Sequence, residues 1–221
     1  MKAKIIFSLA FILFLIVLSN SPARSDCPPG WEEHTVTSLY TYNYGGYYFS
    51  CYFTIVYCCR WNNDLKSVES IIDAVYPLYN SMCWIFITNW GNFRDWVHET
   101  VAEASSQCTP PYPPCDDENN PYYEIQIIAY NCMYFKNYQP YPGDDFICKL
   151  LRCDNQTNYC KKTYRVCMDY SVNPPVVRRI LISVEPYGEP QCPTTRPELP
   201  PEGDPRWGQY WITNCFAEPC Q

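Results

Sequence analysis

The sequence predicts a mainly β fold with one helix, built from two duplicated, disulfide-stapled antiparallel β modules. The first observation behind this prediction is composition: the 221-residue chain has 15 cysteines, 21 tyrosines and 21 prolines. The second is a cysteine spacing that occurs twice. The third is that most apolar segments are short and rich in β-branched and aromatic residues, which favour strands over helices.

The first 25 residues have the features of a secretory signal peptide. Lys2 and Lys4 precede an apolar core at 5–18, and Ala23-Arg24-Ser25 fits a small-x-small cleavage site. The core is shorter than the roughly 20 residues that a membrane-spanning helix needs. We therefore expect a secreted or cell-surface protein that has no membrane association after cleavage.

The net charge also restricts the class of partner. Cleavage after Ser25 would remove Lys2, Lys4 and Arg24 and no acidic residue, so 16 basic residues become 13 against 23 acidic ones, a net charge near −10. A chain this acidic repels phosphate backbones and anionic lipid surfaces. Nucleic acid is therefore not an expected partner.

The cysteine spacing indicates an internal duplication. Cys51, Cys58 and Cys83 are separated by 7 and 25 residues, and so are Cys160, Cys167 and Cys192, at a constant offset of 109. The tripeptide Ile-Thr-Asn also occurs twice, after the third cysteine of each set. A fixed offset of this kind is typical of a repeat. It predicts that 49–60 superposes on 158–169, and 67–76 on 176–185.

The first module is predicted at 26–115. Two strands flank the Gly45-Gly46 turn, which is a hairpin signal. The segment 67–76 has helix-like apolar spacing, but its counterpart follows two prolines and is rich in β-branched residues, so both are predicted to be strands. A helix at about 92–106, with Asn92 as its cap, completes the module.

An acidic, proline-rich linker at 116–121 is expected to lead to the second module at 122–221, which carries an insert at about 131–159. Asp116, Asp117 and Glu118 lack the alternating spacing of a calcium-binding loop, so we expect a solvated linker and no metal. Asn155 begins a glycosylation sequon, which matters only in a eukaryotic host.

Adjacent Cys58 and Cys59 point to opposite faces of a strand, so they should have different roles. Cys59 aligns with Met168 in the repeat, which indicates an apolar slot and predicts a buried free thiol; a disulfide to another chain is the alternative. Cys148 and Cys153 lie close enough in one loop to pair locally, and the connectivity is otherwise open. The disulfide candidates are Cys27, Cys51, Cys58, Cys83, Cys108, Cys115, Cys132, Cys148, Cys153, Cys160, Cys167, Cys192, Cys215 and Cys220.

Catalytic and cofactor-binding patterns are missing from the sequence. It has no nucleophile elbow, phosphate loop or Cys-x-x-Cys pair, and its two histidines, His34 and His98, have no second ligand at metal-binding spacing. We expect His98 on a solvated helix face and His34 in an exposed turn. The expectation is a protein that is not an enzyme and has no cofactor.

The tyrosines are the most unusual feature. Tyrosine combines apolar area with a polar tip and suits either a thin core or a surface that binds protein or glycan. The candidate interface residues crowd one hairpin: Tyr40, Tyr42, Tyr44, Tyr47, Tyr48 and Tyr52.

The start of the predicted mature chain, CPPGW at 27–31, is followed by strands rich in threonine and tyrosine and by the paired cysteines. In these features it resembles uncharacterised secreted cysteine-rich proteins of bacteria. The resemblance implies export beyond the cytoplasm and implies no activity.

Two functions are compatible with these observations. The first is a secreted, non-enzymatic structural or assembly component of the cell exterior, such as a filament subunit whose partner is another copy of itself. The alternative is a soluble extracellular module that uses the tyrosine-rich hairpin to bind a glycan or another extracellular protein. The sequence does not separate the two.

Overall fold

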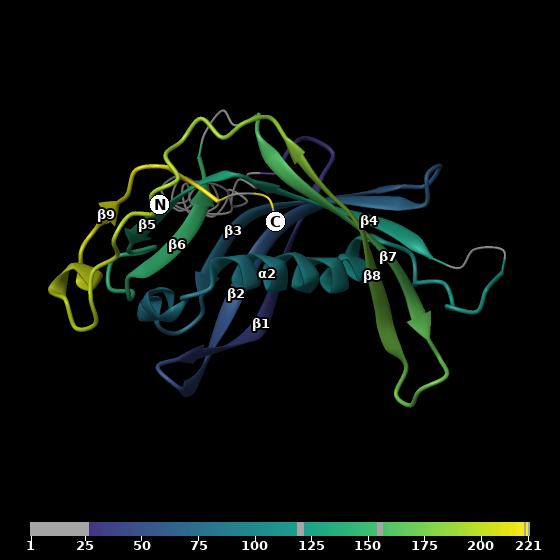
Figure 1. Ribbon diagram of the computed structural model, residues 1–221, viewed down its shortest axis with the longest axis horizontal. Helices are drawn as coiled ribbons and strands as arrows, with labels where there is room; N and C mark the ends of the chain where they lie inside the picture. Colours follow the sequence, from purple (N-terminus) through teal and green to yellow (C-terminus); the bar gives the residue numbers. More distant parts are fainter. Residues whose placement is uncertain (1–26, 119–121, 154–156, 219, 221) are drawn as a thin grey trace, which may run out of the picture.

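The computed structural model describes residues 27–118, 122–153, 157–218 and 220, and Figure 1 shows the arrangement. The predicted signal peptide and Asn155 lie outside the described residues. Ten strands of the described chain form one sheet. They are β1 (Glu32–Tyr44), β2 (Tyr47–Asn62), β3 (Ser67–Pro77), β4 (Tyr123–Tyr130), β5 (Cys132–Tyr138), β6 (Ile147–Arg152), β7 (Tyr159–Asp169), β8 (Val176–Tyr187), β9 (Trp211–Ile212) and β10 (Phe216–Ala217).

The strand β3 lies at the centre of the sheet. It pairs with β2 along one side, and its other side is shared by β4 and β6. Most of its side chains are buried on both faces, so the apolar residues of β3 do not alternate strictly with polar ones. This explains its helix-like spacing, and the prediction that 67–76 is a strand is confirmed.

The predicted helix is present as α2 (Trp90–Ala104), flanked by the short 3-10 helices η1 (Ser81–Phe86) and η2 (Ser105–Cys108). Its cap is Asn89 rather than Asn92, because the Asn89 side chain accepts a hydrogen bond from the Asn92 backbone N–H at 3.0 Å. In Figure 1, α2 lies across one face of the twisted sheet, and the β1–β2 and β7–β8 hairpins diverge on either side of it.

The strands of the two predicted modules join one sheet through β3 and β4. These two strands pair in parallel, and α2 forms the crossover that a parallel connection requires. The predicted insert contributes β5 and β6, and β6 pairs directly with β3. The fold is therefore mainly antiparallel with one parallel junction.

The duplication stays a prediction. The strands β2 with β3, and β7 with β8, are both antiparallel pairs with one register shift each, in agreement with the repeat. The disulfides, however, do not repeat: Cys51 pairs with Cys83, whereas its counterpart Cys160 pairs with Cys220.

Part of the segment before the predicted linker pairs with a strand. Pro114 bridges to Met168 of β7, the Cys115 N–H donates to the Met168 carbonyl, and Tyr112 is buried. The Cys115–Cys167 disulfide fixes this contact. The chain that leads from α2 to β4 is therefore held against the sheet up to residue 115.

Seven disulfides form among the 15 cysteines, which indicates an oxidising environment. The prediction that Cys59 is a free thiol is wrong. Cys58 pairs with Cys27, and Cys59 pairs with Cys108 at the end of η2. The alignment of Cys59 with Met168 gave the wrong answer because α2 and η2 follow β3, and no such helices follow β8 in the second half. Cys59 therefore has a partner, Cys108, that Met168 lacks.

The unpaired cysteine is Cys148, which is fully buried in β6. Its predicted local bridge to Cys153 does not form, and Cys153 pairs with Cys215. β6 (Ile147–Arg152) is extended, so five residues place Cys148 and Cys153 roughly 16 Å apart, and their side chains cannot meet. The odd cysteine therefore belongs to the inserted hairpin.

Candidate functional site

The tyrosines of the predicted interface are divided between core and surface. Tyr40 and Tyr42 are buried, and Tyr40 contacts Phe93 and Trp96 of α2 at ring-centroid distances of 5.1 and 5.0 Å. Burial raises the pKa of both tyrosines. Tyr47, Tyr48 and Tyr52 are exposed. Tyr44 belongs to β1, and its side chain is not among those that the structure describes.

A surface groove adjoins the exposed part of this hairpin. We call it the aromatic groove; it has a volume of about 290 Å³, and its rings are Tyr42, Phe49, Tyr52, Tyr79 and Phe86. The last two follow β3 in the chain, so the tyrosine pattern of the hairpin did not reveal them. The Cys51–Cys83 disulfide joins the two segments, and the matched cysteine spacing was the only sequence signal that connected them.

A second cleft continues from the groove. We call it the acidic cleft; it has a volume of about 490 Å³, and Tyr79 and Asn80 line both cavities. Its far side is the 140–147 segment, which includes Asp144 and Asp145. The two clefts are thus neighbours, with the 84% exposed Tyr79 between them.

The outer strand β8 exposes an unusual number of apolar side chains. Ile180, Leu181 and Ile182 are 64, 48 and 45% exposed, and Val176, Val184 and Tyr187 are also exposed. Ile180 and Leu181 are neighbours that point to opposite faces of the strand, so neither face is covered. Among the described strands, β8 pairs with β7 alone.

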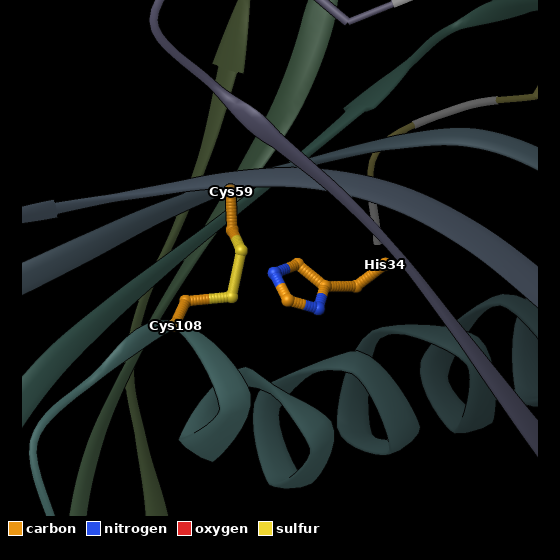
Figure 2. Close-up of side chains that lie close together, drawn as sticks. All are labelled: His34, Cys59 and Cys108. Carbon is orange, nitrogen blue, oxygen red and sulfur yellow. A yellow bond between two sulfur atoms is a disulfide. The ribbon is translucent and has the colours of Figure 1, made fainter. Parts of the chain in front are cut away.

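One group of three possible metal ligands comes together within the described residues: His34, Cys59 and Cys108 (Figure 2). The two sulfur atoms form a disulfide, so they offer no thiolate to a metal ion. The His34 Nδ1 lies 3.1 Å from Gln107 Oε1, and its ring stacks on Tyr57. In this state the cluster is a packed histidine beside a structural bridge, and His34 is partly buried in β1 rather than in a turn.

His98 is buried, so its predicted position on a solvated helix face is wrong. Its Nδ1 donates to the Arg94 carbonyl oxygen at 2.7 Å, and its Nε2 has no hydrogen-bond partner among the described residues. Burial, followed by the nearby Arg94 charge, lowers the pKa of His98 to about 3. The helix buries more than its apolar stripe because the sheet curves around it, and this brings His98 against β7.

The polar side chains near His98 enclose a cavity of about 10 Å³, the size of one water molecule. Lys162 of β7 is buried there and pairs with Asp95 at 2.5 Å. Arg94 donates to the Glu218 carbonyl oxygen at 2.6 Å. This cluster joins α2 to β7 and to the C-terminal segment and has no room for a substrate.

Comparisons with known proteins add no relative: no family model, curated protein or solved structure matches the chain. The resemblance of the CPPGW start therefore stays an expectation. In the part of the chain that the structure describes, no helix is both long and apolar enough to cross a membrane.

Proposed function

We propose that this protein is a secreted, non-enzymatic structural component of the cell exterior whose subunits associate through the β8 edge. The observation that carries the proposal is the exposure of Ile180, Leu181 and Ile182 on a strand whose outer edge has no described neighbour. Soluble proteins usually protect such an edge, because it pairs readily with a second chain.

A second copy of β8 is the occupant that fits this edge best. An antiparallel pair of β8 strands centred between Leu181 and Ile182 would place Arg178 of each copy opposite Glu185 of the other. Two cross-strand pairs of opposite charge would then flank an apolar centre, which is a self-complementary arrangement. The β1 edges would remain at the two outer ends of such a pair.

The chemistry of the buried groups supports a role without catalysis. Burial raises the pKa of the Cys148 thiol, which keeps it protonated and weakly nucleophilic. The low pKa of His98 keeps its imidazole neutral, and the ring is buried between α2 and the sheet. Neither group has the exposure that an attacking nucleophile or a general base needs.

The proposal is tested by the association state of the purified mature chain. Light scattering and negative-stain microscopy should show dimers or larger assemblies in the wild type. Ile180→Lys combined with Ile182→Lys should weaken association at least about a hundredfold, because burying an unpaired charge costs several kcal/mol. The matched control, Thr35→Lys with Leu39→Lys on the exposed side of β1, should associate like the wild type.

The register of the pair has its own test. Arg178→Glu should weaken association by placing like charges opposite each other, and Asp169→Asn, which removes the partner of Arg178 within the chain, should leave association unchanged. A wild-type chain that stays monomeric at high concentration contradicts the proposal. Equal weakening by the β1 and β8 lysines would show that the effect comes from net charge rather than from the β8 edge.

A further inference from the structure

We propose that the aromatic groove and the adjoining acidic cleft together form a binding site for a neutral glycan chain. The site lies on β2, on the segment that follows β3 and on the 140–147 turn, and it includes no residue of β8. It is therefore a second surface, independent of the proposed subunit interface.

The rings of the groove are arranged in two sets. Tyr42, Phe49 and Phe86 form a stack in which Phe49 and Phe86 are 5.6 Å apart and tilted by 3°. Tyr52 and Tyr79 meet edge to face at 6.4 Å and are 49 and 84% exposed. Exposed ring faces with hydroxyl groups at their edges suit sugars, which present both C–H faces and hydroxyls.

The walls of the site are fixed before any ligand arrives. The Cys51–Cys83 disulfide ties β2 to η1 at the floor of the groove. Ser81 Oγ donates to the Phe146 carbonyl oxygen and accepts from the Cys148 N–H, which joins η1 to the acidic side of the cleft. A preformed site loses less conformational entropy on binding than a flexible one.

The charges of the lining exclude acidic ligands. Among the described residues, Asp144 and Asp145 are the only charged ones that line the two cavities, and no lysine, arginine or histidine lines either of them. An acidic glycan or a phosphorylated ligand would meet carboxylates with no compensating cation. Carboxylates can accept hydrogen bonds from the hydroxyl groups of a neutral sugar.

The backbone disfavours an extended peptide in the same place. The Tyr52 carbonyl oxygen already accepts a hydrogen bond from the Leu78 N–H at 2.8 Å, and the Cys51–Cys83 bridge holds η1 against that side of β2. Adding a peptide strand requires an open edge, and at Tyr52 this edge of β2 is already occupied by the chain that follows β3. A ligand in the groove would therefore be bound mainly by side chains.

The size of the site favours a chain over a single sugar. Each cavity is near or within the range of about 300–1,000 Å³ that is typical of ligand pockets, and they meet at Tyr79. A ligand that occupies both must extend past this ring. We therefore expect affinity to increase with the length of the glycan.

The test is binding of the intact, oxidised protein to a panel of neutral gluco-, manno-, xylo- and N-acetylglucosamine oligosaccharides of increasing length, measured by array and calorimetry. At least one series should bind, with affinity rising with length and nearly independent of salt. Tyr79→Ala and Tyr52→Ala should each weaken binding about tenfold, or about 1.4 kcal/mol. Tyr210→Ala, a control at an exposed tyrosine outside both cavities, should leave affinity unchanged.

Near-UV circular dichroism should show that the variants keep the fold, because Tyr52 and Tyr79 are surface residues. Absence of binding across the panel would overturn the proposal. So would salt-sensitive binding of a basic peptide or a quaternary ammonium probe that Asp144→Asn with Asp145→Asn abolishes, since this would make the site one for cations. Loss of glycan binding in the β8 lysine variant would place the site on the subunit interface and contradict its independence.

Discussion

The two outer strands β1 and β8 are edges of the same sheet, yet the helix covers them differently. In β1, Tyr40 and Tyr42 are buried on the side of α2, and the alternate positions expose threonines such as Thr35 and Thr37. In β8, the neighbours Ile180 and Leu181 are both exposed. One edge is an ordinary amphipathic strand, and the other leaves apolar area on both faces.

The contacts with α2 differ in kind as well. The β1 and β2 side packs on the helix through rings, including Tyr40, Phe53 and Phe93. The β7 and β8 side also contributes Tyr164 and Val166 to the core, but it adds ion pairs to the helix: Arg179 pairs with Glu99 and Glu103, and Lys162 with Asp95. Aromatic packing contributes through buried area and is insensitive to pH and salt, whereas an ionic layer is sensitive to both.

This difference accounts for the apolar side chains that β8 leaves at the surface. A strand that is tied down by long charged side chains does not need its apolar side chains to pack on the helix. Those side chains then remain at the surface of the described chain, and the proposed association would bury them against a second copy of β8.

The largest loss of stability is expected among the buried rings that pack β1 and β2 on α2. Phe53 is fully buried between Trp84 and Phe93, so Phe53→Ala should lower the free energy of unfolding by about 3–5 kcal/mol. Leu181→Ala on β8 should change it by less than about 1 kcal/mol in dilute solution, because the side chain is half exposed. Urea unfolding under non-reducing conditions measures both, and a loss at Leu181 as large as that at Phe53 would contradict the comparison.

Much of the β framework could be predicted from the sequence. The cysteine repeat identified β3 as a strand against its helix-like spacing, because the prolines before β8 exclude a helix there. The hairpin followed from Gly45 and Gly46, which both have positive φ angles that favour glycine. Opposite faces for Cys58 and Cys59 followed from strand geometry. These features depend on local patterns, which a single sequence contains.

The features that were missed depend on contacts between distant segments. Cys59 has a partner only because η2 lies beside β2, and His98 is buried only because β7 passes beneath α2. Tyr79 and Phe86 complete the aromatic groove across the Cys51–Cys83 bridge, whose pairing the sequence left open. The exposure of β8 was hidden because its apolar residues look like those of a core strand. Whether a side chain is buried depends on the segments that pack against it, and the sequence pattern does not identify those segments.

A smaller loss of stability is expected when acid protonates the buried His98. The pKa of His98 is lowered from its ordinary value of 6.5 to about 3, so between these pH values the unfolded state binds the proton that the folded state excludes. Stability is therefore complete above pH 6.5 and falls as the pH drops toward 3, by up to about 1.4 kcal/mol per pH unit. Arg94 and Asp95 on α2, Lys162 on β7 and Glu218 line the same cavity as His98.

The measurement compares the wild type with His98→Gln, which cannot take up this proton. Between pH 6.5 and pH 4, the wild type should lose about 3 kcal/mol more than the variant, an order-of-magnitude figure from the pKa difference. Carboxyl groups titrate in both proteins, so they cancel in the difference. If the two proteins lose stability in parallel as the pH falls, His98 takes up its proton in the folded state. The cavity that it lines would then be open to solvent.

The smallest effect is expected at the ion pairs that join β8 to the helix. Arg179 is about one third exposed, and it pairs with Glu99 at 2.9 Å and with Glu103. Because solvent screens such a pair, Arg179→Gln should cost no more than about 1 kcal/mol, and the cost should shrink as salt is added. Arg206→Gln, at the pair between the more exposed Arg206 of η3 (Pro205–Gly208) and the cap residue Asp204, is the matched control and should change stability less.

Urea unfolding at low and high ionic strength separates the possibilities. A loss at Arg179 that disappears in high salt would identify β8 as a strand held to α2 by charge, in contrast to the salt-independent packing of β1. A loss that persists in high salt would mean that the Arg179 side chain stabilises the strand through packing of its apolar stem. In that case the two edges would be held to the helix by the same force, and the contrast between them would be reduced to the exposure of Ile180, Leu181 and Ile182.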